Sequence, residues 1–134
     1  MSEIEQRCDA IESCYEFMLG FAGKGLPNDD GNQVRYHLQR AADALNGLAG
    51  EYTKAVEAHD FKPAEKYHAF LAVLDRDARD SLAAVELVLA QSRISSQLID
   101  NLNGSIHLRA LLTDIFLIDE AFSQRTKAET VKSA

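Results

Sequence analysis

Apolar residues recur along this chain at alternating spacings of four and three positions, and this pattern restricts the fold more than any other feature. In residues 3–23 it is carried by Ile4, Cys8, Ile11, Tyr15, Met18 and Ala22. A mean spacing of about 3.5 residues places these side chains along one face of a helix that packs lengthwise against a neighbour. A β-strand would instead need alternation at every second residue. The pattern therefore predicts an all-α protein.

Four segments keep this pattern, and short links connect them. Helices joined by short links lie antiparallel to their neighbours. We therefore predict an up-down-up-down four-helix bundle with helices over about residues 3–23, 33–59, 63–91 and 96–122. Residues 1–122 would form a single helical-bundle domain, followed by a flexible C-terminal tail over residues 123–134. A chain of 134 residues is long enough to bury such a core without disulfides or metal.

The ends of these helices are placed from short sequence signals. Asn32 is expected to cap the second helix, and Pro63 to be the first residue of the third. A turn is placed at residues 92–95, because one helix over residues 63–122 would be about 90 Å long, too long for a compact domain of this size. Gly47 lies inside the second helical pattern. We attribute it either to the close approach of a neighbouring helix or to a kink.

The charge of the chain argues against two classes of partner. Its formal net charge is −7 at pH 7, whereas general nucleic-acid binders need a dense basic surface to displace counterions. Docking on anionic lipid would need a polybasic patch, and no apolar run approaches the roughly 20 residues of a membrane span. The first residues lack the basic and then apolar layout of a signal peptide. We therefore expect a cytoplasmic protein that binds neither nucleic acid nor membrane.

No catalytic motif is found in the sequence. A phosphate-binding glycine loop, a zinc-ligand spacing and a nucleophile elbow are all absent from it. Cys14 lies among apolar residues in an acidic chain, and these conditions raise the pKa of a thiol and disfavour a nucleophile. The sequence thus indicates a protein without enzymatic activity, and we expect no cofactor.

The predicted fourth helix is apolar on almost every side from residue 108 onward. Its apolar residues are Leu108, Ala110, Leu111, Leu112, Ile115, Phe116, Leu117 and Ile118. A four-helix monomer covers only part of each helix, so a helix that is apolar all round needs an additional cover. Self-association is the simplest cover, and a central place in the domain is the alternative. We therefore expect a homodimer.

Polar residues interrupt the same helix at regular intervals. One face would carry Asp100, Asn103, His107 and Asp114, and Arg109 lies on a second stripe. These residues form either a pocket, in which His107 and Arg109 bind an anionic ligand or a partner's carboxylate, or a half-exposed surface. Asp114 has apolar neighbours at most helical contact positions, so we expect it to be buried against a basic residue of another helix. The candidates for that partner are Arg35, Arg40 and Arg76.

Glu65 and His68 form a Glu-x-x-His pair near the start of the predicted third helix. In di-metal carboxylate bundles, two such pairs and a glutamate from each of two further helices converge on the core. This sequence has one pair, and a symmetric dimer could supply the second. A single pair also arises readily by chance in an acidic helical protein. Glu65 and His68 are therefore candidate metal ligands only in an alternative interpretation.

These features together predict a non-enzymatic helical-bundle protein that acts through protein–protein contacts, as an accessory, adaptor or assembly factor. The alternative is a bundle that binds a small ligand or a metal between its helices. A packed interior with an apolar outer patch would favour the first function. A cavity in which polar side chains converge would favour the second.

Overall fold

The chain folds into helices throughout the part that the structure describes. The computed structural model describes residues 2–133, with side chains described for residues 2–125. Its elements are α1 (Glu3–Ala22), α2 (Val34–Leu45), α3 (Leu48–His59), α4 (Ala64–Leu89), α5 (Ser96–Gly104) and α6 (His107–Ser133). The prediction of an all-α protein is confirmed. The prediction of four uninterrupted helices is wrong, because two of them are each divided in two.

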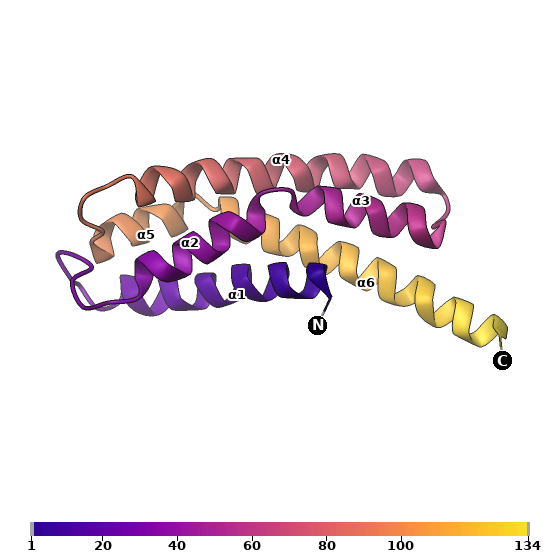
Figure 1. Cartoon of the computed structure of the whole chain (residues 1–134), viewed down its shortest axis with the longest axis horizontal. Coiled ribbons are helices and arrows are strands. Elements are labelled where there is room, and N and C mark those ends of the chain that lie inside the picture. Colours follow the sequence, from indigo (N-terminus) through magenta and orange to yellow (C-terminus); the bar gives the residue numbers. More distant parts are fainter. Residues whose placement is uncertain (1, 134) are drawn as a thin grey trace.

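The helices lie alongside one another in an elongated molecule (Figure 1). After a short break α3 continues the direction of α2, and α6 continues that of α5 in the same way (Figure 1). α1 packs against α2, α3, α5 and α6, and α4 packs against the same four helices. The predicted helix over residues 33–59 is thus replaced by the shorter helices α2 and α3, and the predicted helix over residues 96–122 by α5 and α6.

A break at Asn46 and Gly47 separates α2 from α3. Gly47 has a φ angle of +84°, a left-handed conformation that glycine adopts without steric cost. From α1, Nη1 of Arg7 donates to the carbonyl oxygens of Ala44 at 3.0 Å and Asn46 at 2.7 Å. It thereby satisfies carbonyl groups that the end of a helix leaves without helical partners. A Cβ added at Gly47 would meet no described atom within 4 Å, so this glycine permits a break rather than the close approach of a neighbouring helix.

A second break separates α5 from α6. The backbone N–H of Ile106 donates to the carbonyl of Asn103 at 3.1 Å and closes the last turn of α5. Ile106 itself has a φ angle of +60°. This conformation is rare for a β-branched residue and costs roughly 1–2 kcal/mol for residues with a Cβ. The break is therefore held by the surrounding fold against the local preference of isoleucine.

α6 begins and ends later in the sequence than the predicted fourth helix. It begins at His107 and continues to Ser133, whereas the sequence pattern placed its end near residue 122. Its C-terminal part extends past the other helices at one end of the molecule (Figure 1). The flexible tail over residues 123–134 stays a prediction, because the side chains beyond residue 125 lie outside the described part.

The other helix starts agree with the sequence signals at one place and differ at two. Ser95 caps α5, and its Oγ accepts a hydrogen bond from the backbone three residues on, which agrees with the predicted turn before this helix. Pro63 is not the first residue of α4 but the extended residue directly before it, because the helix begins at Ala64. Asn32 does not cap α2, because Gln33 occupies that position and makes no capping hydrogen bond with its side chain.

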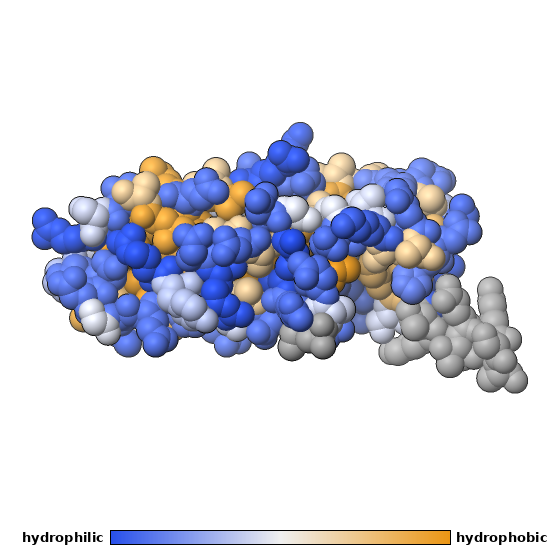
Figure 2. Space-filling model, viewed as in Figure 1, coloured by the Kyte–Doolittle hydropathy of each residue, from blue (hydrophilic) through white to orange (hydrophobic). Residues whose placement is uncertain are grey.

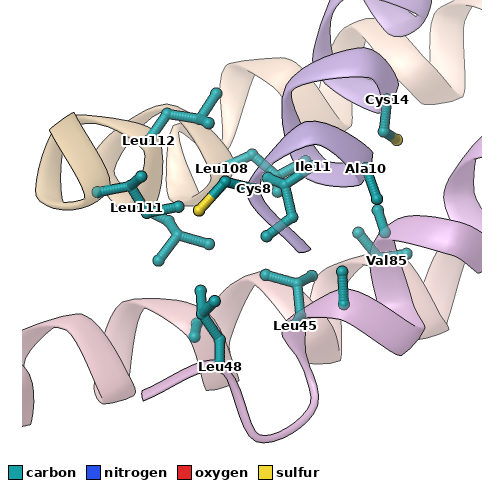
Figure 3. Packing of buried hydrophobic residues seen from close by; sticks show 14 of the residues in the cluster. Cys8, Ala10, Ile11, Cys14, Leu45, Leu48, Val85, Leu108, Leu111 and Leu112 are labelled. Carbon is teal, nitrogen blue, oxygen red and sulfur yellow. The ribbon is translucent and has the colours of Figure 1, made fainter. Parts of the chain in front are cut away.

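An apolar core runs between the helices. Side chains from α1, α4 and α6 and from both sides of the first break point toward one another, among them Ile11, Leu45, Leu48, Val85 and Leu111 (Figure 3). Burying a large aliphatic side chain contributes about 1.5–3 kcal/mol. Cys8 and Cys14 are free thiols within this core. As predicted, burial raises the pKa of the Cys14 thiol, to about 12.

Candidate functional site

α6 divides its apolar residues between the core and the surface. Those that are buried are Leu108, Leu111, Leu112, Ile115 and Ile118. Phe116 and Leu117 point outward instead, with 57% and 58% of their surface exposed. The surplus apolar surface that the sequence predicts is therefore concentrated in these two adjacent residues.

Two grooves border this pair of residues. In the larger groove, of about 290 Å³, Phe116 and Leu112 of α6 lie next to Tyr15 of α1. In the smaller groove, of about 150 Å³, Leu117 lies next to Phe70 of α4. Apolar side chains of α1 and α4 thus lie beside α6 on its two sides. We call the surface formed by Tyr15, Phe70, Phe116 and Leu117 the α6 face.

Other exposed apolar residues are more scattered. They are Leu19, Tyr36, Val73, Leu87 and Ile106. The side of the molecule seen in Figure 2 is mostly hydrophilic, and its hydrophobic residues gather mainly where α2 and α4 lie side by side. Exposed apolar residues that stand singly are normal on protein surfaces. The α6 face differs from them because two large adjacent side chains are bordered by apolar grooves.

Charged residues of both signs surround the α6 face. Glu12 and Glu16 of α1 and Arg109 of α6 line the larger groove, and Lys66 of α4 lines the smaller one. Burial raises the pKa of the Glu12 carboxyl, and nearby carboxylates, led by that of Asp9, raise it further. A surface with both signs of charge around an apolar centre has the composition of a protein interface.

The polar stripe predicted for the fourth helix does not form one pocket in the described part of the chain. The second break leaves Asp100 and Asn103 on α5 and places His107, Arg109 and Asp114 on α6. Asp100, His107 and Arg109 are exposed, and Asn103 is half-buried. Asp100 lines a pocket beside the end of α1, whereas Arg109 lines the larger groove of the α6 face. The break therefore ends the continuous helix face on which the prediction depended.

Asp114 is half-buried where α6 packs on α4, and its Oδ2 atom is buried without a hydrogen-bond partner among the described residues. Its carboxyl meets that of Asp77 in α4, and two carboxyl groups so placed form a hydrogen bond only by sharing a proton. Burial, and then Asp77, raise the pKa of Asp114 to about 7. The partner of Asp114 is thus the acid Asp77. The prediction that Asp114 pairs with Arg35, Arg40 or Arg76 is wrong.

Arg35 has a different structural role from the one predicted for it. Its Nε donates to Oδ2 of Asp29 at 3.2 Å, and its Nη1 donates to the carbonyl of Leu89 at 2.9 Å. Asp29 in turn accepts a hydrogen bond from the backbone of Ile94. These contacts connect the loop before α2 to the loop after α4.

Glu65 and His68 lie on the surface of α4, and both are exposed. Within the described residues, no group of three or more histidine, cysteine, aspartate or glutamate side chains is placed to hold a metal ion. The two residues therefore have no further ligands from the described part of their own chain. Their role in metal binding stays a prediction of the alternative interpretation, which depends on a second copy.

Sequence reasoning missed a polar cluster at the edge of the core. The hydroxyl of Tyr52 donates to Oδ1 of Asp119 at 2.8 Å and lies 3.3 Å from Sγ of Cys8. Burial raises the pKa of the Tyr52 hydroxyl, and it raises that of the Cys8 thiol to about 11. A thiol with such a pKa is protonated at neutral pH and is a poor nucleophile. Tyr52 and Asp119 are 67 positions apart, so no local pattern signals the contact.

Cys8 and Asp119 also line a groove between α1, α3 and α6, with a volume of about 640 Å³. Its carboxylates are those of Glu5, Asp9 and Glu12 on α1 and of Asp119 on α6. Burial raises the pKa of Asp119, and the charge of Glu5 raises it further, while the hydrogen bond from Tyr52 lowers it. We call this feature the acidic groove.

Two further findings bear on the class of the protein. None of the helices, as far as their residues are described, combines the length and the apolar character needed to cross a membrane. No protein family model matches the chain, and no curated protein or solved structure matches it significantly.

Proposed function

We propose that this protein acts through protein–protein contacts made by the α6 face, as a non-enzymatic accessory, adaptor or assembly factor of the cytoplasm. The observation that supports this function is the exposure of Phe116 and Leu117 side by side between two apolar grooves. Large exposed apolar side chains beside grooves, with aromatic residues among them, are typical of interaction sites. In this proposal the fold is an up-down-up-down bundle of four helical segments. α2 and α3 together form the second segment, and α5 and α6 together form the fourth.

The first partner that we propose is a second copy of the chain. A two-fold contact requires a self-complementary surface, and the larger groove carries both Glu16 and Arg109. Each of these charges can therefore meet its opposite across a dimer axis. Phe116 and Leu117 each have more than half of their surface left to bury, which corresponds to about 1–2 kcal/mol for each side chain. These two residues would form the centre of the contact.

Light scattering at increasing micromolar concentrations tests this proposal. The wild-type protein should approach twice the 14.8 kDa mass of the chain, whereas the Phe116→Ser/Leu117→Ser variant should remain a monomer. The matched control is Tyr36→Ser/Leu87→Ser, which removes two exposed side chains of α2 and α4 that line neither groove of the α6 face. It should dimerise like the wild type. A wild-type protein that keeps a mass of 14.8 kDa at high concentration would contradict the homodimer.

A second candidate function is the binding of a small ligand or a metal between the helices. One observation favours it: Oδ2 of Asp114 and Oγ of Ser81 are buried without hydrogen-bond partners among the described residues. Each such atom costs about 1–3 kcal/mol, which a bound ligand could recover. Metal analysis of the purified protein tests this function. Stoichiometric metal that is lost in His68→Ala or in Asp114→Asn would support it, and well under one equivalent would favour the protein contacts.

A further inference from the structure

The acidic groove has the shape and the charge of a docking site, and it lies beside the α6 face, with Glu12 lining both this groove and the larger groove of that face. We propose that it binds a basic amphipathic helix of a partner protein. This inference rests on the proposed function and extends it from a second copy of the chain to a partner protein with another sequence. It depends on Glu5 and Asp9 of α1, which line neither groove of the α6 face.

The floor of the groove is apolar and partly aromatic. It contains Ile4, Cys8, Ala55, Phe61 and Phe122. The rings of Phe61 and Phe122 pack with their centroids 4.9 Å apart, and that of Phe122 also contacts Tyr52 at 5.7 Å. Because these rings are held by one another, the floor offers a preformed surface for the apolar face of a helix.

The length of the groove also fits a helix. Its lining extends along α1 from Ser2 to Glu12, which corresponds to about 15 Å at the rise of an α-helix. Along this path Glu5, Asp9 and Glu12 follow one another at spacings of four and three residues, so they lie on one face of α1. Asp119 approaches from α6. The carboxylates are thus spread over the groove rather than gathered at one point.

The negative charge of the groove is not balanced within the described residues. Among the lining residues, His59 alone is able to carry a positive charge. Arg7, which lies between Glu5 and Asp9 in the sequence, is engaged elsewhere, with Glu3 at 2.8 Å and with the carbonyls at the end of α2. Mutual repulsion of these carboxylates contributes to the raised pKa values of Glu12 and Asp119, after burial. A cationic partner would relieve this repulsion.

The spacing of the charges favours a helix over a small cation as the occupant. Glu5 and Glu12 are about 10 Å apart along α1, so a single ammonium group cannot reach both. A helix with lysine or arginine at every third or fourth position presents its cations at matching intervals. If the same helix carries leucine residues one turn apart on the adjoining face, their side chains would lie on Phe61 and Phe122.

The probe for this proposal is a synthetic amphipathic helical peptide of leucine and lysine with a fluorescent label. The control peptide has the same sequence with glutamate in place of lysine. We expect the lysine peptide to bind in fluorescence anisotropy and the glutamate peptide not to bind. Glu5→Gln/Asp9→Asn should weaken binding about tenfold, and the control Asp80→Asn/Glu86→Gln on α4 by less than about twofold. Ala55→Phe, which fills the groove without changing its charge, should weaken binding as well.

Three results would overturn the proposal. Equal losses in the two charge variants would show general attraction to an acidic protein. Displacement of the peptide by spermidine at equal concentration would identify a small organic cation as the occupant. Loss of binding in Phe116→Ser/Leu117→Ser would place the peptide on the α6 face, which would leave the proposed function intact. Retained binding in that variant, even if the wild type is a monomer, would support the acidic groove independently of dimerisation.

Discussion

The Asp114→Asn substitution should stabilise the folded protein at about pH 8, although it removes a carboxylate from a helix interface. Asp114 meets Asp77 there, and burial together with this neighbour raises the pKa of Asp114 from 3.8 to about 7. Above that pH both carboxyl groups are ionised and repel each other. Asparagine has the same size, carries no charge and can donate a hydrogen bond to Asp77. The variant therefore removes the repulsion and keeps the contact.

The magnitude and the sign follow from the raised pKa. A pKa that rises from 3.8 to about 7 corresponds to an upper limit of about 4 kcal/mol. Because Asp114 is only half-buried, solvent screening reduces this to about 1–2 kcal/mol. Between about pH 4 and pH 7 the folded state binds more protons than the unfolded state. The contribution of this pair to stability is therefore fully present below about pH 4 and is lost as the pH rises through 7.

Urea unfolding at about pH 5 and about pH 8 measures this effect. The wild type should lose about 1–2 kcal/mol between the two conditions through this pair, and Asp114→Asn should lose much less. A smaller slope should remain, because the pKa values of Glu12 and Asp119 are also raised. The control Asp80→Asn, an exposed position of α4, should keep the slope of the wild type. Identical slopes for wild type and Asp114→Asn, or a less stable Asp114→Asn at the higher pH, would refute the reasoning.

Three further predictions concern the helix breaks and the core. Arg7→Ala should destabilise the protein by about 1–3 kcal/mol in urea unfolding, because the carbonyl of Asn46 loses a charged donor; an unchanged midpoint would contradict this. Ile106→Gly should stabilise it by about 0.5–1 kcal/mol, because glycine accepts the φ angle of +60° and Ile106 is exposed; a lower melting temperature would count against it. Cys14, which has no exposed surface and a thiol pKa raised to about 12 by burial, should react with a thiol reagent only on unfolding. Fast labelling of Cys14 in the native protein would contradict the packed core.

The helical class of this protein follows from its sequence alone. The spacing of four and three residues is a property of each segment by itself, and it requires a helix in whatever fold the segment joins. Some helix starts are equally local. Ser95 caps α5 with its own side chain, and Pro63 lies within one position of its predicted place at the start of α4. These features were predictable because the groups that stabilise them are neighbours in the sequence.

The two breaks depend on tertiary structure. The apolar pattern continues across Asn46 and Gly47 without interruption, and the donor that satisfies the end of α2 is Arg7, 37 and 39 positions away from the carbonyls it meets. At the second break the sequence has Ile106, whose local preference opposes the observed φ angle. In both places packing between distant segments outweighs the tendency of one helix to continue.

The candidate surfaces show the same division between local pattern and packing. The sequence indicated that the last helix carries more apolar surface than one domain can cover, but only its packing between α1 and α4 leaves Phe116 and Leu117 exposed. The period of one helix likewise placed Asp114 among apolar neighbours without indicating Asp77 as its partner. Which residues meet between two helices depends on their relative register and rotation. The packing of the whole core determines both, and the period of a single helix contains neither.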